Sequence, residues 1–235
     1  MTIEQTVVQT SRSSHFRAGF LAGIPLWLGA APFGLIYAVS ALSAGLTPAQ
    51  TAAMSLFVFA GASQFTAVGM IAAGSGPFAV VLTTLIVNAR HLLLTASLLP
   101  YLRGLPKPAL LGLAAQLTDE SYALAIGKFL AGTGKPAFLA GANMSIYVVW
   151  QVSAWVGIWL GRSIPDPAAY GLDLVFPLTF IGLLVPLLRR PGAWPIALIA
   201  ALISIITALL LPGGWHILFA AIGAGLFAGN RRQPV

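Results

Sequence analysis

Three charged residues lie inside apolar stretches of this sequence. Arg90 sits near the middle of 78–101, and the adjacent Asp119 and Glu120 sit near the middle of 108–131. Each stretch is long enough to cross a bilayer, which takes about 20 helical residues. A charge at the bilayer centre costs roughly 2.5–3.5 kcal/mol on insertion scales, so such residues usually mark a route for a substrate or a proton. The charges therefore predict transport, with Arg90 paired to one of the two acids.

Polar side chains accompany the charges at helical spacing. On the first stretch they form a stripe one step from Arg90, made of Thr84, Asn88, His91 and Thr95. On the second stretch Tyr122 follows Asp119 by three residues and so lies on the same face. A purely structural ion pair would need one cation and one anion, so the second acid, with Asn88 and His91, favours a functional site. Either acid could accept a proton, and His91 is the other candidate because imidazole changes charge near neutral pH.

The composition is that of an integral membrane protein. Of 235 residues, 58% are hydrophobic and 7% are charged, and the mean hydropathy is +0.92; soluble domains carry about 25% charged residues. We expect an all-α helix bundle forming one transmembrane domain over 18–230, between a polar cytoplasmic tail at 1–17 and a short tail at 231–235. There are no cysteines, which excludes disulfides and thiolate metal sites. The basic residues lie at the ends of spans and form no stripe for nucleic acid.

Helix breakers and charges divide the chain into eight predicted segments. They are 19–44, 49–73, 77–101, 108–131, 136–161, 173–188, 194–211 and 213–229. If all cross and the N-terminus is cytoplasmic, eight basic residues face inward and three face outward, namely Arg103, Lys107 and Arg162. That asymmetry agrees with the positive-inside rule. Seven crossings with one re-entrant segment is the alternative.

Two segments carry signs of a break within the membrane. The first contains Pro25, Pro32 and Gly34, and proline removes an amide donor and clashes with the preceding turn. The second contains Gly61, Ser63 and Gln64 in the run FAGASQF. Unwound backbone at membrane depth is found where it faces protein or water, and half-helix ends there can hold a carboxylate. Close packing of helices through small residues is the alternative.

Weaker signals come from the fifth segment and from internal similarity. Asn143 and Trp150 share a helical sector there and could line a pocket, although packing is the commoner role of aromatics. FAGAS at 59–63 resembles LAGAN at 139–143, and 98–115 resembles 184–201. Both pairs lie three segments apart, which would give an inverted repeat, as in many secondary transporters. Chance similarity among common membrane residues is the alternative.

Four motifs in this order resemble the AzlC family of branched-chain amino acid exporters. They are PFGLIYA at 32–38, FAGASQF at 59–65, VNARHLLLTASL at 87–98 and LTDESYAL at 117–124. The resemblance implies a bacterial inner-membrane protein that works with a small hydrophobic subunit of the AzlD type and exports leucine, isoleucine and valine. The sequence departs from the family pattern at LLLT (92–95), where an aromatic is expected, so the substrate is open. No P-loop is present, which argues against ATP coupling.

Together these signals predict a secondary active exporter of small apolar amino acids, coupled to protons. A passive channel and a structural subunit of a membrane complex are the alternatives. An enzyme is not expected, because Ser63 lacks the Gly-x-Ser-x-Gly context of a serine nucleophile and His15, His91 and His216 are dispersed. We expect no cofactor and no metal. The candidate site residues in full are Pro32, Gly34, Gly61, Ser63, Gln64, Asn88, Arg90, His91, Asp119, Glu120, Tyr122 and Asn143.

Overall fold

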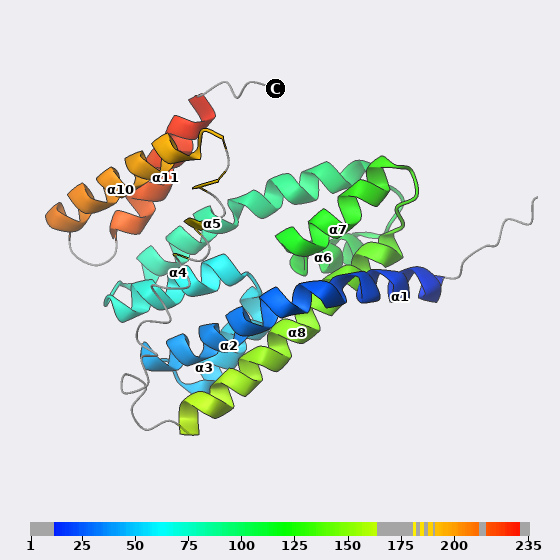
Figure 1. Ribbon diagram of the computed structural model, residues 1–235, viewed down its shortest axis with the longest axis horizontal. Helices are drawn as coiled ribbons and strands as arrows, with labels where there is room; N and C mark the ends of the chain where they lie inside the picture. The colour runs from blue at the N-terminus through cyan, green and yellow to red at the C-terminus, as the bar shows by residue number, and fades with distance from the viewer. Residues whose placement is uncertain are drawn as a thin grey trace, which may run out of the picture. The chain divides into compact units, whose positions relative to one another are not determined.

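The computed structural model describes residues 12–163, 191–211 and 215–230, with a few isolated positions between 181 and 189. Over these residues the chain forms helices and no strand (Figure 1). The all-α prediction is therefore confirmed. The helices in chain order are α1 (Arg12–Gly23), the 3₁₀ turn η1 (Ile24–Leu26), α2 (Trp27–Ser43), α3 (Pro48–Val58), α4 (Gly61–Ala72), α5 (Pro77–Leu98), η2 (Leu99–Tyr101), α6 (Lys107–Ala115), α7 (Asp119–Leu130), α8 (Pro136–Ser163), α10 (Ala193–Leu210) and α11 (Trp215–Asn230).

Four stretches of the described chain are long and apolar enough to cross a membrane. They are Arg12–Ser43, Pro77–Tyr101, Pro136–Gly161 and Ala193–Leu210. These agree with four predicted segments, which confirms the polytopic membrane fold. The first begins at Arg12, so the predicted tail at 1–17 ends inside α1. The predicted segment 173–188 lies mostly outside the described residues.

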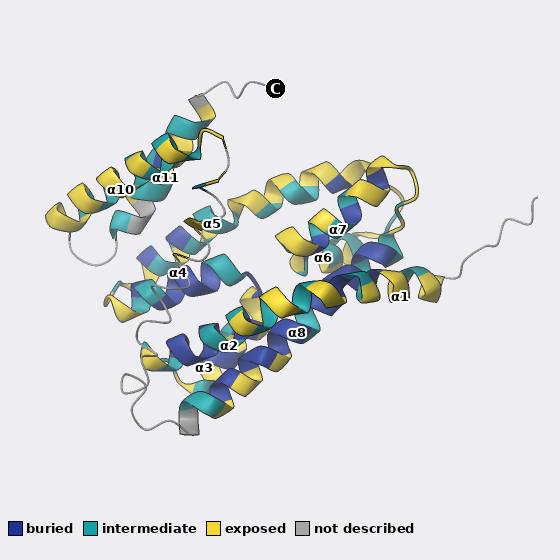
Figure 2. Ribbon diagram, in the orientation of Figure 1, coloured by how far each residue is buried: buried dark blue, intermediate teal, exposed yellow. Residues whose placement is uncertain are grey.

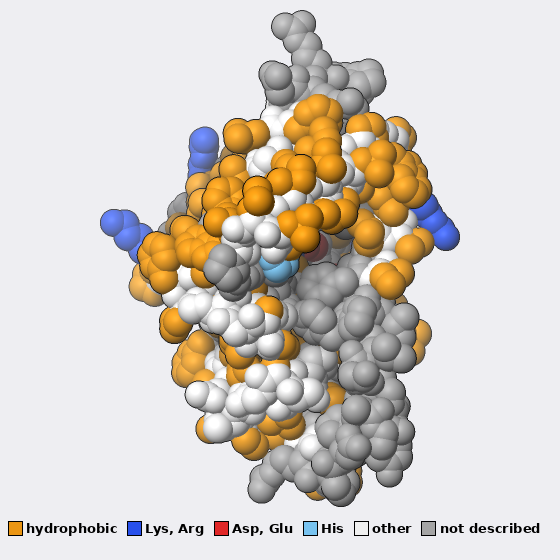
Figure 3. Space-filling model, turned by 90° about the vertical axis from the view of Figure 1, so that its left-hand side faces the viewer, with side chains coloured by type: hydrophobic (Ala, Val, Ile, Leu, Met, Phe, Trp, Pro, Cys, Tyr) orange, Lys and Arg blue, Asp and Glu red, His pale blue; other side chains and the backbone are white. Residues whose placement is uncertain are grey.

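The surface of these helices suits lipid. In α10 no residue is buried, and Leu198, Leu202 and Leu209 are 62%, 59% and 82% exposed. Figure 2 shows exposed residues along α5 and α10, and hydrophobic side chains gather over the upper part of the face in Figure 3, with Lys and Arg at its edges. On a soluble monomer, so many exposed hydrophobic side chains would mark an interaction surface. In a membrane protein, lipid acyl chains can cover them.

The chain divides into two compact units. Unit 1 comprises 1–31 and 91–149, and unit 2 comprises 32–90 and 150–235. The divisions fall inside α2, α5 and α8, so these three helices contribute residues to both units.

In unit 2, α3 and α4 fold back on each other as a hairpin. The hydroxyl of Tyr37 in α2 donates a hydrogen bond of 2.8 Å to the carbonyl oxygen of Thr51 in α3. The ring of Tyr37 also lies 6.2 Å from the ring of Phe65 in α4, edge to face. In one straight helix residues 51 and 65 would be about 21 Å apart, so contact with the same tyrosine requires a reversal between them. The segment predicted to cross at 49–73 is a hairpin of two short helices.

In unit 1, α6 and α7 form a second hairpin. Tyr101, which precedes α6, stacks on Phe129 near the end of α7, with 5.4 Å between ring centroids. The two helices have 9 and 12 residues, or about 14 and 18 Å, and each covers about half of a bilayer core. The segment predicted to cross at 108–131 therefore returns to the end from which it started.

This second hairpin corrects the predicted sidedness of two basic residues. Arg12, Leu105 and Pro136 line one cavity of unit 1, so the loop before α6 lies at the same end of the unit as the starts of α1 and α8. The prediction that placed Arg103 and Lys107 opposite Arg12 is wrong. It assumed that 108–131 crosses once, whereas the hairpin brings the chain back.

The two hairpins are related by an internal repeat of 58 to 59 residues. Gly45 and Gly104 each precede a hairpin with φ of 89°, and Gly74 and Gly132 each follow one with φ of 72°. Only glycine adopts this conformation readily, which explains why both hairpins have glycine at these positions although the side chains around them differ. The sequence AGSG at 73–76 matches AGTG at 131–134. A long helix followed by a hairpin thus occurs twice.

The repeat predicted between FAGAS and LAGAN is not this one. Residues 59–63 contain the hairpin turn, whereas 139–143 lie inside the continuous helix α8. The two segments therefore have different structures, and their similarity reflects common membrane residue types.

Glycine allows α1 and α8 to touch backbone to backbone in unit 1. A Cβ added at Gly141 would collide with the carbonyl oxygen of Phe16, while one added at Gly127 in α7 would meet nothing within 4 Å. Such close approach through small residues is the usual way helices associate in membranes.

We expect Gly141→Ala to lower the free energy of unfolding by about 1–3 kcal/mol, the usual cost of overpacking. Gly127→Ala, in open space, is the matched control and should be neutral or slightly stabilising. Thermal unfolding of both purified variants, followed by tryptophan fluorescence, measures the difference. Equal midpoints would show that α1 and α8 are not packed this closely.

Candidate functional site

The unit 2 hairpin turns at Phe59 and Ala60, directly before the start of α4. Phe59 has φ of 33°, a left-handed conformation, and Ala60 is extended with φ of −143°. Ala60 is the N-cap of α4 and has no side chain that can accept a hydrogen bond. The first amides of α4 therefore receive no side-chain cap from it, and they carry the positive end of the helix dipole. Such an end attracts anions.

Three of the predicted site residues gather at this turn. Ser63 Oγ donates a hydrogen bond of 2.5 Å to Asn88 Oδ1, which joins α4 to α5. Gln64 is fully buried beside the Tyr37 hydroxyl, yet neither atom of its side-chain amide makes a hydrogen bond of good geometry with another described residue. A buried polar group without a partner costs about 1–3 kcal/mol, so Gln64 is suited to a ligand or a water.

Aromatic rings surround the same turn. Tyr37 stacks on Trp150 at 6.1 Å, and Phe65 meets Tyr37 and Phe33 edge to face. Gly61 lies against the indole of Trp150, whose Nε1 is buried and lacks a hydrogen bond in the described structure. Unit 2 therefore combines a helix N-terminus, unsatisfied polar groups and an apolar aromatic lining.

The first segment is irregular at Pro25, as predicted, but the predicted break at Pro32 and Gly34 is wrong. Helix α2 continues from Trp27 to Ser43 with Pro32 inside it, and the irregular turn comes earlier, in η1, where Pro25 occupies the first turn. Gly34 instead gives α2 close contact with Trp150 and Ser153 of α8. Membrane helices tolerate an internal proline because neighbouring groups satisfy the carbonyl that loses its partner.

The turn of the unit 1 hairpin carries the two acids. Asp119 and Glu120 form the first turn of α7, and both are exposed in the isolated chain. Thr118 caps the helix by accepting from the Ser121 amide at 3.2 Å, and the Ser121 hydroxyl accepts from the Thr118 amide at 3.0 Å. Carboxylates at a helix N-terminus are stabilised by about 0.3–1 kcal/mol. The acids are therefore held by the end of a half-helix rather than lying along the middle of a span.

Ser97 of α5, through Tyr122, and Asn143 of α8 support this second turn. The hydroxyl of Ser97 in α5 lies 3.0 Å from that of Tyr122. Asn143 Nδ2 in α8 donates a hydrogen bond of 3.0 Å to the carbonyl oxygen of Leu113, one of the last residues of α6. Because helix ends leave carbonyls unpaired, Asn143 stabilises the end of α6 just before the turn.

The predicted pairing of Arg90 with an acid stays a prediction. Arg90 is the last residue of the unit 2 portion of α5, whereas Asp119 and Glu120 belong to unit 1. Arg90, His91 and Asp119 each take part in interactions of their own, so none of them is unpartnered. Among the described residues, no group of three His, Asp or Glu side chains could hold a metal ion.

The sequence did not predict a role for Tyr37, for Ser55 or for the capping residues. Ser55 Oγ donates to Gln151 Oε1 at 2.9 Å, and Gln151 Nε2 donates to the Ser55 carbonyl oxygen at 2.9 Å, which fixes α3 against α8. Tyr37 lies in the PFGLIYA motif but looked apolar in context. Thr118 before two acids is a helix-start signal that could have revealed the break at 116–118.

Comparison with known proteins identifies the family. A model of the AzlC protein family matches residues 25–164, more than half of the chain. The chain belongs to the AzlC family. This membership confirms the resemblance drawn from the four sequence motifs.

Several individual proteins are similar to this chain over most of its length. The branched-chain amino acid transport protein AzlC of Bacillus subtilis is 27% identical over 208 residues, which are 88% of this chain and 81% of that protein. The inner membrane protein YgaZ of Escherichia coli is 27% identical over 76% of this chain and 75% of its own length. An uncharacterized membrane protein of Helicobacter pylori is 26% identical over 88% of this chain and 90% of its own length. No solved structure matches the chain.

Proposed function

We propose that this AzlC-family protein exports branched-chain or similar small apolar amino acids across the bacterial inner membrane, driven by protons, together with a small hydrophobic subunit of the AzlD type. The name of the Bacillus subtilis relative supports the substrate class. The observation that carries the mechanism is the contrast between the two hairpins. One presents a neutral helix N-terminus without a side-chain cap, and the other presents a capped N-terminus with two acids.

The carboxylate of the substrate binds at the first turn of α4 in this proposal. Its partners are the amides of residues 61–63, the positive end of the helix and the buried amide of Gln64. Apolar side chains of the substrate suit the rings of Phe33, Phe65 and Trp150 that surround this turn. Arg90, in the same unit, contacts the carboxylate or holds an acid in place.

Asp119 or Glu120 accepts the coupling proton. Both belong to a half-helix of a predicted membrane stretch, where ionisable groups commonly form proton relays. His91 is the second candidate for this role.

The N-terminus faces the cytoplasm. The hairpin of α6 and α7 places Arg103 and Lys107 at the same end as Arg12, and the loop before α8 lies there too. Six basic residues of 12–163 then share that side, namely Arg12, Arg17, Arg103, Lys107, Lys128 and Lys135, against Arg162 at the far end of α8. The positive-inside rule makes their side cytoplasmic.

The test is leucine efflux from proteoliposomes that contain the chain with and without a small hydrophobic subunit of the AzlD type. We expect saturable efflux that accelerates when the outside is acidic. Glu120→Gln or Asp119→Asn should remove the response to the pH gradient, because the amide cannot carry a proton. Unsaturable flux without a pH response would indicate a channel, and no flux of any apolar amino acid with the partner present would refute the proposal.

A further inference from the structure

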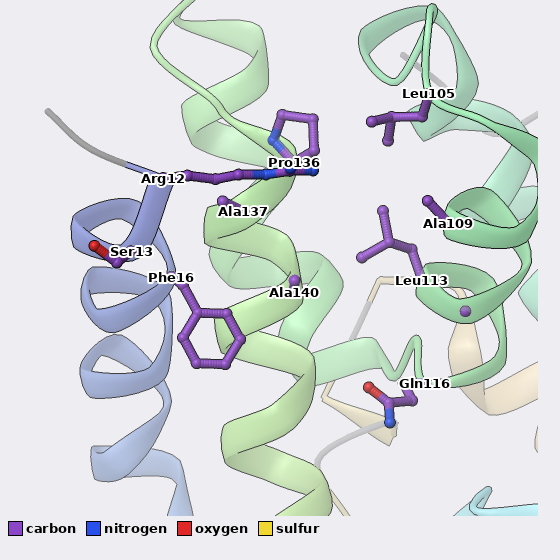
Figure 4. A pocket seen from close by; sticks show the side chains of 11 residues that line it. Arg12, Ser13, Phe16, Leu105, Ala109, Leu113, Gln116, Pro136, Ala137 and Ala140 are labelled. Atoms are coloured by element: carbon purple, nitrogen blue, oxygen red, sulfur yellow. The ribbon is translucent and has the colours of Figure 1, made fainter. Parts of the chain in front are cut away.

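Unit 1 holds a cavity of about 560 Å³ between α1, α6 and the start of α8 (Figure 4). Binding sites for small molecules typically measure about 300–1,000 Å³, so one amino acid with its water fits. The cavity lies wholly inside unit 1 and is separate from the turn of α4 in unit 2.

The two ends of the cavity are polar. Figure 4 shows the side chain of Arg12 extending from α1 across to Pro136, while Gln116 lies at the opposite end. None of the described residues that line the cavity is acidic, so the guanidinium has no carboxylate there to neutralise it. Arginine binds carboxylates through paired, charge-assisted hydrogen bonds.

The wall between these ends is apolar. Phe16, Leu105 and Leu113 supply the large side chains, and the space between them exists because the remaining wall is built from alanines and Gly112. A Cβ at Gly112 would meet nothing within 4 Å. An aliphatic side chain a few carbons long matches this wall, and burying it is favourable by about 0.8 kcal/mol per CH₂ group.

The position of the cavity links the basic end of unit 1 to its hairpin turn. Arg12, Leu105 and Pro136 mark the end that carries the basic residues. Gln116 is the C-cap of α6, three residues before Asp119. A ligand that enters at Arg12 and moves inward therefore arrives at the acids of α7.

From this geometry we propose that the cavity is the cytoplasmic entry site, which captures an aliphatic carboxylate before transport. The carboxylate binds Arg12, and the aliphatic part lies against Phe16 and Leu113. This inference rests on the proposed function for the identity of its ligand, a branched-chain amino acid. A lipid acyl chain is the poorer occupant, because it would end against the Gln116 amide and strip its water without replacing the hydrogen bonds.

The chain has no cysteine, so a single one can report on the cavity. Gly112→Cys places a thiol in the cavity wall, and Gly127→Cys on α7, which does not line the cavity, is the matched control. A Cβ added at either glycine would meet nothing within 4 Å. The rate of reaction with a maleimide is measured in detergent and in inside-out vesicles. The probes are leucine, 4-methylpentanoate, which lacks the amine, and 3-methylbutylamine, which lacks the carboxylate.

We expect leucine and 4-methylpentanoate to slow labelling of Gly112→Cys at least fivefold, and the amine to leave it unchanged. Adding Arg12→Gln should remove the protection, and Gly127→Cys should react at one rate throughout. Equal rates with all probes, or protection by vesicle lipid alone that leucine does not alter, would overturn the inference. If labelling is not protected while leucine efflux proceeds, the entry site fails and the proposed function stands. If leucine and 4-methylpentanoate protect the thiol but the protein transports no amino acid, the entry site stands and the proposed function fails.

Discussion

Single cysteines at Pro106 and Thr133 should react with a membrane-impermeant maleimide from the same face of the membrane, in an all-or-none manner. The two positions flank the α6–α7 hairpin, and Tyr101 stacked on Phe129 brings its two ends together. Both sites are exposed, and the natural chain offers no competing thiol. The measurement compares labelling of right-side-out and inside-out vesicles.

Ser13→Cys provides the reference, because the cavity places Pro136 and Leu105 beside the start of α1. Ser43→Cys and Ala73→Cys, which flank the α3–α4 hairpin, should agree with each other and react from the other face, since α5 is long enough to cross between Ala73 and Pro106. If Pro106 and Thr133 react from opposite faces, α6 and α7 form a crossing and the hairpin is refuted.

The long helices could be predicted from the sequence. Apolar stretches of about 20 residues bounded by Gly, Pro or basic residues leave few other structures in a bilayer, and the predicted bounds 77–101 and 136–161 agree with α5 with η2, and with α8. Family membership followed from four short motifs, because these contain the polar residues that a purely apolar helix lacks.

The hairpins could not be predicted, because hydropathy is the same whether a stretch of about 24 residues crosses or folds back. Whether a stretch crosses or folds back depends on contacts between residues distant in sequence, such as those of Tyr37 with Thr51 and Phe65. It also depends on the left-handed Phe59, a conformation that its residue type does not suggest. The cytoplasmic N-terminus stays a prediction, and folding back both segments does not change it, because the number of crossings falls by two.

The candidate residues divide in the same way. Ser63, Gln64 and Asn88 do gather at one turn, where the hydrogen bond from Ser63 to Asn88 joins α4 to α5. Asn143 supports α6 instead, at the other hairpin. The sequence could not assign which acid pairs with Arg90, because Arg90 belongs to unit 2 and both acids belong to unit 1.

Replacing Ala62 with Asp should slow transport by roughly 10- to 100-fold without unfolding the protein. Ala62 occupies the first turn of α4 at the position that the repeat aligns with Glu120 of α7. An acid there is favourable for the helix by about 0.3–1 kcal/mol. The same acid would occupy the positive helix end that we assign to the substrate carboxylate and would repel it. Losing a hydrogen-bonded contact to a charged group costs about 1.5–3 kcal/mol, or roughly 10- to 100-fold in rate.

Ala62→Asn is the control that isolates charge from size, because Asn has nearly the same volume and can also cap the helix. Leucine efflux should fall far more for Ala62→Asp than for Ala62→Asn, and thermal stability should be equal or higher for the acid. If the two variants transport alike, the carboxylate does not bind at α4, and the neutral hairpin is a packing element. If only the acid variant unfolds, the α4 end is not a positive terminus open to anions. The contrast between a neutral and an acidic hairpin would then have no bearing on the substrate.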